Sequence, residues 1–242
     1  MARKGKMYDR TIDSKHLHES ITIKIYEPEQ FDSLYEHNVI IMQDGDDYFH
    51  LGRVATVSDR LHDQFDIVNA TFVGIPYKDR FDRWKKYHPN GEQFNAYKAF
   101  LHDEVVPLID ELLPLNPLGT IRTLLGDSLG GTVSLLLALD YPNMFQRVVM
   151  QSPYVDENVI AAVNRFDNIV EPQIFHTYGL AEIDVPTTKM GRLNFVKPNE
   201  QLAGLLSETF ASYEKLVNPE GNHTWKYWQK ELPDLLVKAL NA

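Results

Sequence analysis

The chain has 242 residues, enough for one large or two small domains, and 43% of them are hydrophobic, which excludes a disordered protein. Asp and Glu number 34 against 24 Lys and Arg, a formal net charge of −10. That balance argues against a nucleic-acid partner, because phosphate backbones are bound by clustered positive charge. The absence of cysteine excludes disulfides, cysteine-bound metals and a cysteine nucleophile.

The start of the chain, MARKGKMY, is basic, but no apolar segment of the kind found in secretory signals follows it. No run of about 18 apolar residues occurs elsewhere, so the sequence predicts no membrane-spanning helix and no membrane partner. We therefore expect a soluble cytoplasmic protein.

The predicted strands fall into two kinds. Met7–Ile12 and Ser20–Tyr26 alternate apolar and polar residues, which predicts an antiparallel hairpin at a sheet edge. The later strands are compact apolar or β-branched runs, as expected where both faces of a strand are covered. These later strands are Val39–Met42, Val68–Ile75, Ile121–Leu125, Val148–Met150 and Ile174–Tyr178.

Amphipathic segments separate these strands. The predicted helices are Val54–Phe65, Gln93–Leu113, Leu129–Leu139, Asn158–Phe166, Glu200–Lys215 and Trp225–Leu240. Strands that alternate with helices predict an α/β fold, with one mostly parallel twisted sheet and helices on both faces. Ligands of such folds bind at the carboxyl ends of the strands, so the functional residues are expected there.

The sequence Gly126-Asp-Ser128-Leu-Gly130 stands between a predicted strand and a predicted helix. A serine in such a sharp turn has a strained backbone, and side chains two residues away on either side would collide. The turn exposes the hydroxyl at a helix N-terminus, where the N–H of Leu129 can stabilise an oxyanion. The pattern therefore predicts a nucleophilic Ser128. The alternative is a glycine-rich helix start with a serine N-cap.

The chain resembles the α/β-hydrolases, specifically the esterase family that includes ferric-enterochelin esterases, esterase D-like and feruloyl-type esterases, and mycolyltransferases. The resemblance is carried by Val39–Phe49, Arg83–Pro89, Phe100–Pro107, the turn at Ser128, and Gly221–Trp225. These stretches span most of the chain in the family's order, and no lid insertion is recognisable. The resemblance implies a single α/β-hydrolase domain over residues 1–242, without a large lid.

The base should follow the nucleophile, because α/β-hydrolases order their catalytic residues Ser, acid, His. Only His176 and His223 follow Ser128. His176 lies in a predicted strand, whereas His223 lies in a turn-rich loop before the last helix. The resemblance implies His223, because the family's Gly-x-His-x-Trp pattern reads Gly221–Trp225 here.

The acid is expected in a loop after a late strand, where it can orient the imidazole. Glu182 occupies the acidic position of the family's Gly-x-x-Asp-x-x-Val-Pro spacing. Asp184 is the alternative if the turn is tighter, and Asp156, after the preceding strand, is a third candidate. The resemblance favours Glu182.

A second oxyanion donor is expected from the loop after the Val39–Met42 strand. The resemblance implies the amide of Asp46, with Gly45 permitting close backbone approach. The carboxylates of Asp44, Asp46 and Asp47 also suggest a cation site, but their spacing does not match an EF-hand. We expect no metal and no cofactor.

These residues predict a serine carboxylesterase whose partner is a small-molecule ester. Ser128 attacks the carbonyl, His223 takes and returns the proton, Glu182 holds His223, and the amides of Leu129 and Asp46 stabilise the oxyanion before the acyl-enzyme is hydrolysed. The same machinery serves thioesterases, peptidases and acyltransferases. A catalytically silent hydrolase fold used for binding, or a structural protein with a chance Gly-x-Ser-x-Gly, are alternatives from other classes. The ordered presence of nucleophile, acid and base argues against both.

Overall fold

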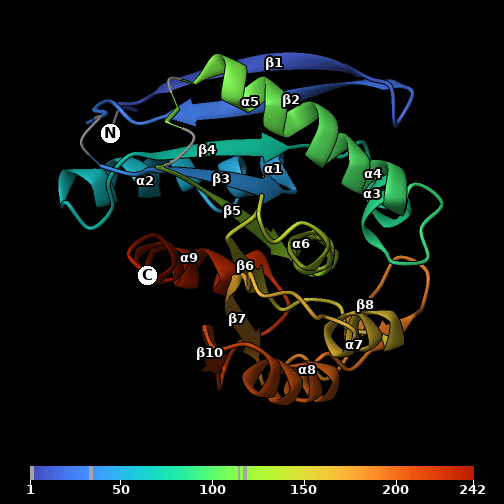
Figure 1. Cartoon of the computed structure of the whole chain (residues 1–242). Helices are drawn as coiled ribbons and strands as arrows, with labels where there is room; N and C mark the ends of the chain where they lie inside the picture. The colour runs from blue at the N-terminus through green and yellow to red at the C-terminus, as the bar shows by residue number, and fades with distance from the viewer. Residues whose placement is uncertain (1–2, 33–34, 114, 117–118) are drawn as a thin grey trace.

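The structure is built around an eight-stranded, mostly parallel sheet (Figure 1). The computed structural model describes residues 3–32, 35–113, 115–116 and 119–242. The strand order is β1-β2-β4-β3-β5-β6-β7-β10, antiparallel between β1, β2 and β4 and parallel elsewhere. The strands are β1 (Lys6–Ser14), β2 (Glu19–Glu27), β3 (His37–Gln43), β4 (Ala70–Ile75), β5 (Thr120–Asp127), β6 (Arg147–Gln151), β7 (Gln173–Gly179) and β10 (Tyr213–Asn218).

Burial along the strands follows the two sequence patterns. Every residue of β3 and β4 is buried, as their apolar runs predict. In β2 the buried Ile21, Ile23 and Ile25 alternate with more exposed residues up to Tyr26, which is buried in the second hydrophobic cluster. The predicted mostly parallel sheet with an antiparallel edge hairpin is confirmed.

Helices cover both faces of the sheet, as predicted (Figure 1). Those packed in one hydrophobic cluster are α1 (Gly45–His50), α2 (Val54–Asp63) and α9 (Trp225–Leu240). Those packed in the other are α3 (Arg80–Tyr87), α4 (Phe94–Phe100), α5 (Val106–Leu112), α6 (Leu129–Asp140), α7 (Glu157–Asn164) and α8 (Val196–Thr209).

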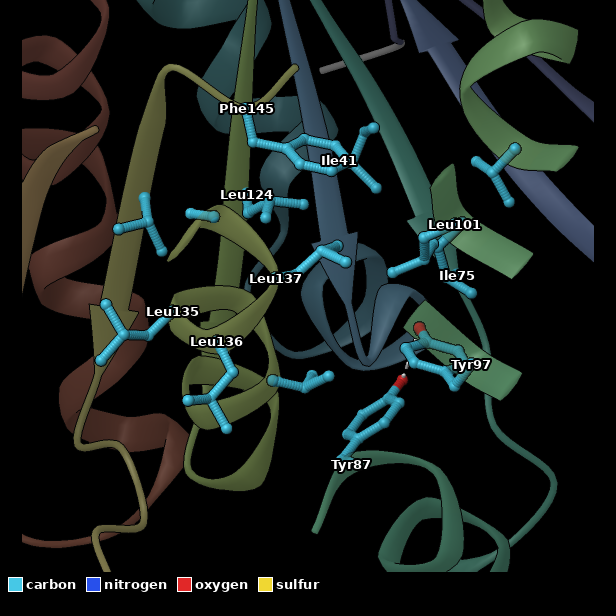
Figure 2. Close-up of a cluster of buried hydrophobic side chains, with 14 of the residues drawn as sticks. Ile41, Ile75, Tyr87, Tyr97, Leu101, Leu124, Leu135, Leu136, Leu137 and Phe145 are labelled. Atoms are coloured by element: carbon cyan, nitrogen blue, oxygen red, sulfur yellow. Dashed lines mark hydrogen bonds between the residues drawn. The ribbon is translucent and has the colours of Figure 1, made fainter. Parts of the chain in front are cut away.

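Helix α6 is the most deeply enclosed of these helices. Its first ten residues are all buried, because the helix is apolar all round and is packed on every side. Figure 2 shows Leu135, Leu136 and Leu137 of α6, which belong to the same buried cluster as Ile41 of β3 and Leu124 of β5. The start of α6 is therefore anchored in the rigid centre of the molecule.

Two predicted helices differ in the structure. The predicted helix Gln93–Leu113 is interrupted by a π-helical turn, Leu101–Val105, between α4 and α5. Pro107 is the second residue of α5 and has no backbone N–H to donate to the preceding turn. The predicted helix Glu200–Lys215 was wrong at both ends: α8 runs from Val196 to Thr209, and Tyr213–Lys215 belong to β10. Parallel pairing of β10 with β7 overrides the local helical pattern there.

Candidate active site

Ser128 lies between the end of β5 and the start of α6, in the predicted strand-turn-helix arrangement. Its backbone has φ 50° and ψ −123°. A positive φ is uncommon for a residue other than glycine, so this turn is held in place by the packing around it. As the first residue of α6, Leu129 has a backbone N–H that no carbonyl inside the helix accepts.

The two glycines that lie two residues before and after Ser128 are required by close contacts. A Cβ on Gly126 would lie 2.2 Å from the carbonyl carbon of Gly130. A Cβ on Gly130 would lie 2.9 Å from Oδ2 of Asp44, in the loop after β3. The turn therefore packs against its own helix on one side and against the β3–α1 loop on the other.

Ser128 and His223 line the same narrow cleft at the carboxyl ends of the strands, with a volume of about 80 Å³. The other lining residues are Arg83, Trp84, Leu129, Tyr154, Val185, Pro186, Thr187, Thr188, Met190 and Phe195. Part of this wall comes from a short hairpin, β8 (Val185–Pro186) and β9 (Arg192–Leu193), that the sequence did not predict. The His223 ring packs against Phe195, with ring centroids 4.3 Å apart.

Glu182 is the carboxylate that the structure brings to His223. Its Oε2 lies 2.9 Å from Nδ1 of His223, and the residue has no exposed surface. Its Oε1 accepts hydrogen bonds from Ser152 Oγ at 2.6 Å and from the backbone N–H of Gly179 at 2.9 Å. Trp228 Nε1 in turn donates to Ser152 Oγ at 3.1 Å. Both carboxylate oxygens are therefore satisfied, and the side chain is fixed in the orientation that meets the imidazole.

The other two candidate acids are engaged elsewhere. The Asp184 side chain is 64% exposed and accepts a 2.8 Å hydrogen bond from Nε of Arg192, which lowers the pKa of Asp184. Asp156 caps helix α7 by accepting from the first backbone N–H groups of that helix. In the described part of the chain neither carboxylate has a hydrogen bond to His223.

The β3–α1 loop approaches the Ser128 turn through Asp44. Asp44 has φ 58°, and its backbone carbonyl accepts from the N–H groups of Asp47 and Tyr48. The expected donor Asp46 is the second residue of α1 and has an exposed side chain. Among the described residues, Leu129 lines the cleft with Ser128 and Asp46 does not.

Arg83 joins the elements of the site, a role that the sequence reasoning missed. Its Nε and Nη2 donate to Oδ1 and Oδ2 of Asp44 at 2.8 and 2.5 Å, and Nη2 also donates to the backbone carbonyl of Asp127 at 2.9 Å. Burial would lower the pKa of Arg83, but the charges of Asp44 and Asp127 raise it overall. Burial and then the Asp44 charge raise the pKa of Asp127 well above its usual range.

Within the described residues no group of three or more His, Asp or Glu side chains is arranged to hold a metal ion. Asp44, the buried member of the acidic loop, is bound by Arg83 instead. In the same part of the chain no helix is long and apolar enough to cross a bilayer.

The model of the Esterase family, whose description reads "Putative esterase", matches residues 14–239. The chain belongs to this esterase family. A relative from Bacillus subtilis (strain 168), "Uncharacterized protein YjcH", is 43% identical over 239 residues, which is 98% of this chain and 99% of the relative.

Two solved esterase structures share the fold at low sequence identity. Enterochelin esterase from Shigella flexneri superposes with a TM-score of 0.79 at 18% identity, over 97% of this chain and 57% of that one. A ferulic acid esterase superposes with a TM-score of 0.76 at 16% identity, over 99% of both chains. The chain thus spans little more than half of the Shigella enterochelin esterase, whereas it matches the ferulic acid esterase over nearly its full length.

Proposed function

We propose that this member of the esterase family hydrolyses small carboxylic esters through Ser128, His223 and Glu182. The observation that carries the proposal is the 2.9 Å contact between the buried Glu182 carboxylate and His223 Nδ1, beside a serine with a strained backbone in the same cleft. Membership of the esterase family supports ester hydrolysis independently.

The chemistry proceeds in two halves. Ser128 Oγ attacks the ester carbonyl carbon, and Nε2 of His223 accepts the hydroxyl proton because Nδ1 is engaged by Glu182. The imidazolium then protonates the leaving alcohol, which leaves an acyl group on Ser128. Water attacks this acyl-enzyme with His223 again as base, which releases the acid and restores the serine.

The tetrahedral intermediates carry a negative charge on the former carbonyl oxygen. The Leu129 N–H at the start of α6 is one donor to this oxygen, supported by the partial positive charge of the helix N-terminus. The amide of Asp46 is the proposed second donor, because the β3–α1 loop packs on the Ser128 turn through Asp44 and Gly130.

The cleft favours compact substrates. Its volume of about 80 Å³ accommodates the reacting ester group but lies well below the roughly 300–1,000 Å³ of ordinary small-molecule sites. A neighbouring pocket of about 280 Å³ shares Tyr154, Met190 and Phe195 with the cleft and takes one apolar substituent of the ester. These dimensions support small esters in preference to long acyl chains.

The test compares hydrolysis of p-nitrophenyl acetate and butyrate by the wild type, Ser128→Ala and Ser207→Ala. Ser207 is an exposed serine on α8 and is the matched control. The wild type and Ser207→Ala should hydrolyse both esters, and Ser128→Ala should lose at least about 10⁴-fold in kcat. Wild-type rates in Ser128→Ala would refute the proposal.

A further inference from the structure

The two loops that carry the proposed oxyanion amides meet at one buried guanidinium. Asp44 lies two residues before Asp46, and Asp127 lies two residues before Leu129. Arg83, from helix α3, donates two hydrogen bonds to the Asp44 carboxylate and one to the Asp127 backbone carbonyl. A third segment of the chain therefore ties the β3–α1 loop to the Ser128 turn.

The geometry of this contact restricts both loops. A planar guanidinium that binds a carboxylate through two parallel hydrogen bonds fixes its orientation as well as its distance. The side chains are well shielded, with exposed fractions of 17% for Arg83, 1% for Asp44 and 7% for Asp127. Hydrogen bonds between ions in such a setting are stronger than in water.

The Asp44 carboxylate also packs on the backbone of the Ser128 turn. A Cβ on Gly130 would lie 2.9 Å from Asp44 Oδ2, so no side chain fits between them. The Asp44 carboxylate and the Ser128 turn therefore lie close together. The positive φ of Asp44, 58°, is a further constraint on the loop that the Arg83 contact helps to hold.

Asp127 is the third ionisable group of this cluster. Burial and the nearby Asp44 charge raise the pKa of Asp127 well above its usual range, while Arg83 opposes this rise. Asp127 Oδ2 lies 3.6 Å from Arg83 Nη2, and its Oδ1 is buried with no hydrogen-bond partner among the described residues.

We propose that Arg83 is a positioning residue, which holds the β3–α1 loop and the Ser128 turn at the separation where the amides of Asp46 and Leu129 bind one oxyanion. The inference rests on the proposed function. Nε and Nη2 of Arg83 are occupied by protein oxygens, and these contacts carry the positioning role. Arg83 also lines the cleft, so the test separates an effect on kcat from a direct substrate contact, which would raise KM.

The test measures kcat, KM and the thermal midpoint Tm for Arg83→Lys and Asp44→Asn with p-nitrophenyl acetate. Arg83→Lys keeps the charge and loses the planar fork, and Asp44→Asn keeps the shape and loses the charge. Arg80→Lys is the matched control, because Arg80 is exposed one turn earlier on the same helix. If Arg83→Lys fails to fold, Asp44→Asn still tests whether the contact between Arg83 and Asp44 affects kcat.

Each single variant should lose about 10²-fold in kcat with KM within about twofold of wild type, since one oxyanion donor is worth about 10²–10³ in kcat. The double variant should be no slower than the slower single variant, because both remove the same contact. Arg80→Lys should match the wild type, and every variant should remain folded at the assay temperature.

Three results would overturn the inference: unchanged kcat in folded Arg83→Lys or Asp44→Asn, an increase in KM alone, which marks a direct substrate contact, or losses that add in the double variant. Ser128→Ala in the same assay separates this inference from the proposed function. If Ser128→Ala is inactive and Arg83→Lys has the wild-type kcat, only the positioning role fails. If Ser128→Ala retains wild-type activity, the proposed function fails and the positioning role with it.

Discussion

Glu182 meets His223 Nδ1 at 2.9 Å, although Glu182 and the exposed Asp184 lie only two residues apart in one loop. Glu182 is buried and Asp184 is exposed because the backbone N–H of Gly179, at the end of β7, donates a hydrogen bond to Glu182 Oε1. Ser152, after β6, binds the same oxygen. The neighbouring strand ends therefore select which carboxylate reaches the imidazole.

Replacing the acid should slow the reaction far more than replacing its neighbour. Glu182→Gln should lower kcat for p-nitrophenyl acetate by about 10⁴-fold, because the amide supplies no negative charge to stabilise the imidazolium and permits the wrong tautomer. Asp184→Asn, the matched control, should stay within about twofold of wild type. A larger loss in Asp184→Asn than in Glu182→Gln would mean that the acid is assigned wrongly.

Replacing Ser152, which binds Glu182, should also slow the reaction, but by a smaller factor than replacing Glu182. Ser152→Ala removes the hydroxyl between Trp228 Nε1 and Glu182 Oε1 and leaves both with one partner fewer. We expect kcat to fall about tenfold, because a hydrogen bond to a charged group contributes about 1.5–3 kcal/mol and the Gly179 bond remains. Steady-state kinetics on the folded variant check this, and an unchanged kcat would show that Glu182 needs no support from Ser152.

Replacing Gly130 and Gly204 with alanine should change the free energy of unfolding in opposite directions. Gly130→Ala forces a methyl group against Asp44 Oδ2 and should destabilise the protein by about 1–3 kcal/mol, with loss of esterase activity. Gly204→Ala, on the exposed side of α8 with nothing within 4 Å of the added Cβ, should stabilise it by about 0.5–1 kcal/mol. Urea unfolding of both variants measures the difference. Equal changes in the two variants would contradict the packing described at the Ser128 turn.

Stability should fall in mild acid because of His176. This buried imidazole in β7 lies 2.8 Å from Oδ1 of Asn199, and burial lowers its pKa from 6.5 to about 4. Between these values the unfolded chain binds a proton that the folded protein does not. The contribution of neutral His176 to the free energy of unfolding is therefore complete above pH 6.5. It decreases as the pH falls toward 4, by roughly 3 kcal/mol in total.

Urea unfolding of the wild type and His176→Gln at pH 7.5 and 4.5 tests this effect. Carboxylates titrate in both proteins, so the difference between their losses isolates the histidine. The wild type should lose about 2–3 kcal/mol more than His176→Gln over this range. Equal losses would show that His176 is not held neutral in the folded protein.

The local features of the fold were predictable from the sequence. The apolar run of β3 reflects burial on both faces, and Gly126 reflects a contact within the Ser128 turn. The resemblance to the esterase family favoured Glu182 over Asp184 and Asp156, and the Glu182 side chain lies beside His223.

Features that depend on distant partners were not predictable. Strand β10 carries no apolar run, because it lies at the sheet edge with exposed Glu214 and Lys215, and only its pairing with β7 defines it. Arg83 and Asp44 look like surface charges in the sequence, since nothing near either residue indicates that they form a buried pair. Such contacts appear only when the fold brings separate loops together.

Covalent labelling of the nucleophile is the most direct test of the central claim. The folded protein is incubated with a fluorophosphonate, and the adduct is located by peptide mass spectrometry. We expect one adduct per chain, on Ser128, absent from Ser128→Ala and formed at least about 10²-fold more slowly in His223→Ala. An adduct on a different residue, or labelling of Ser128 at the same rate without His223, would contradict it.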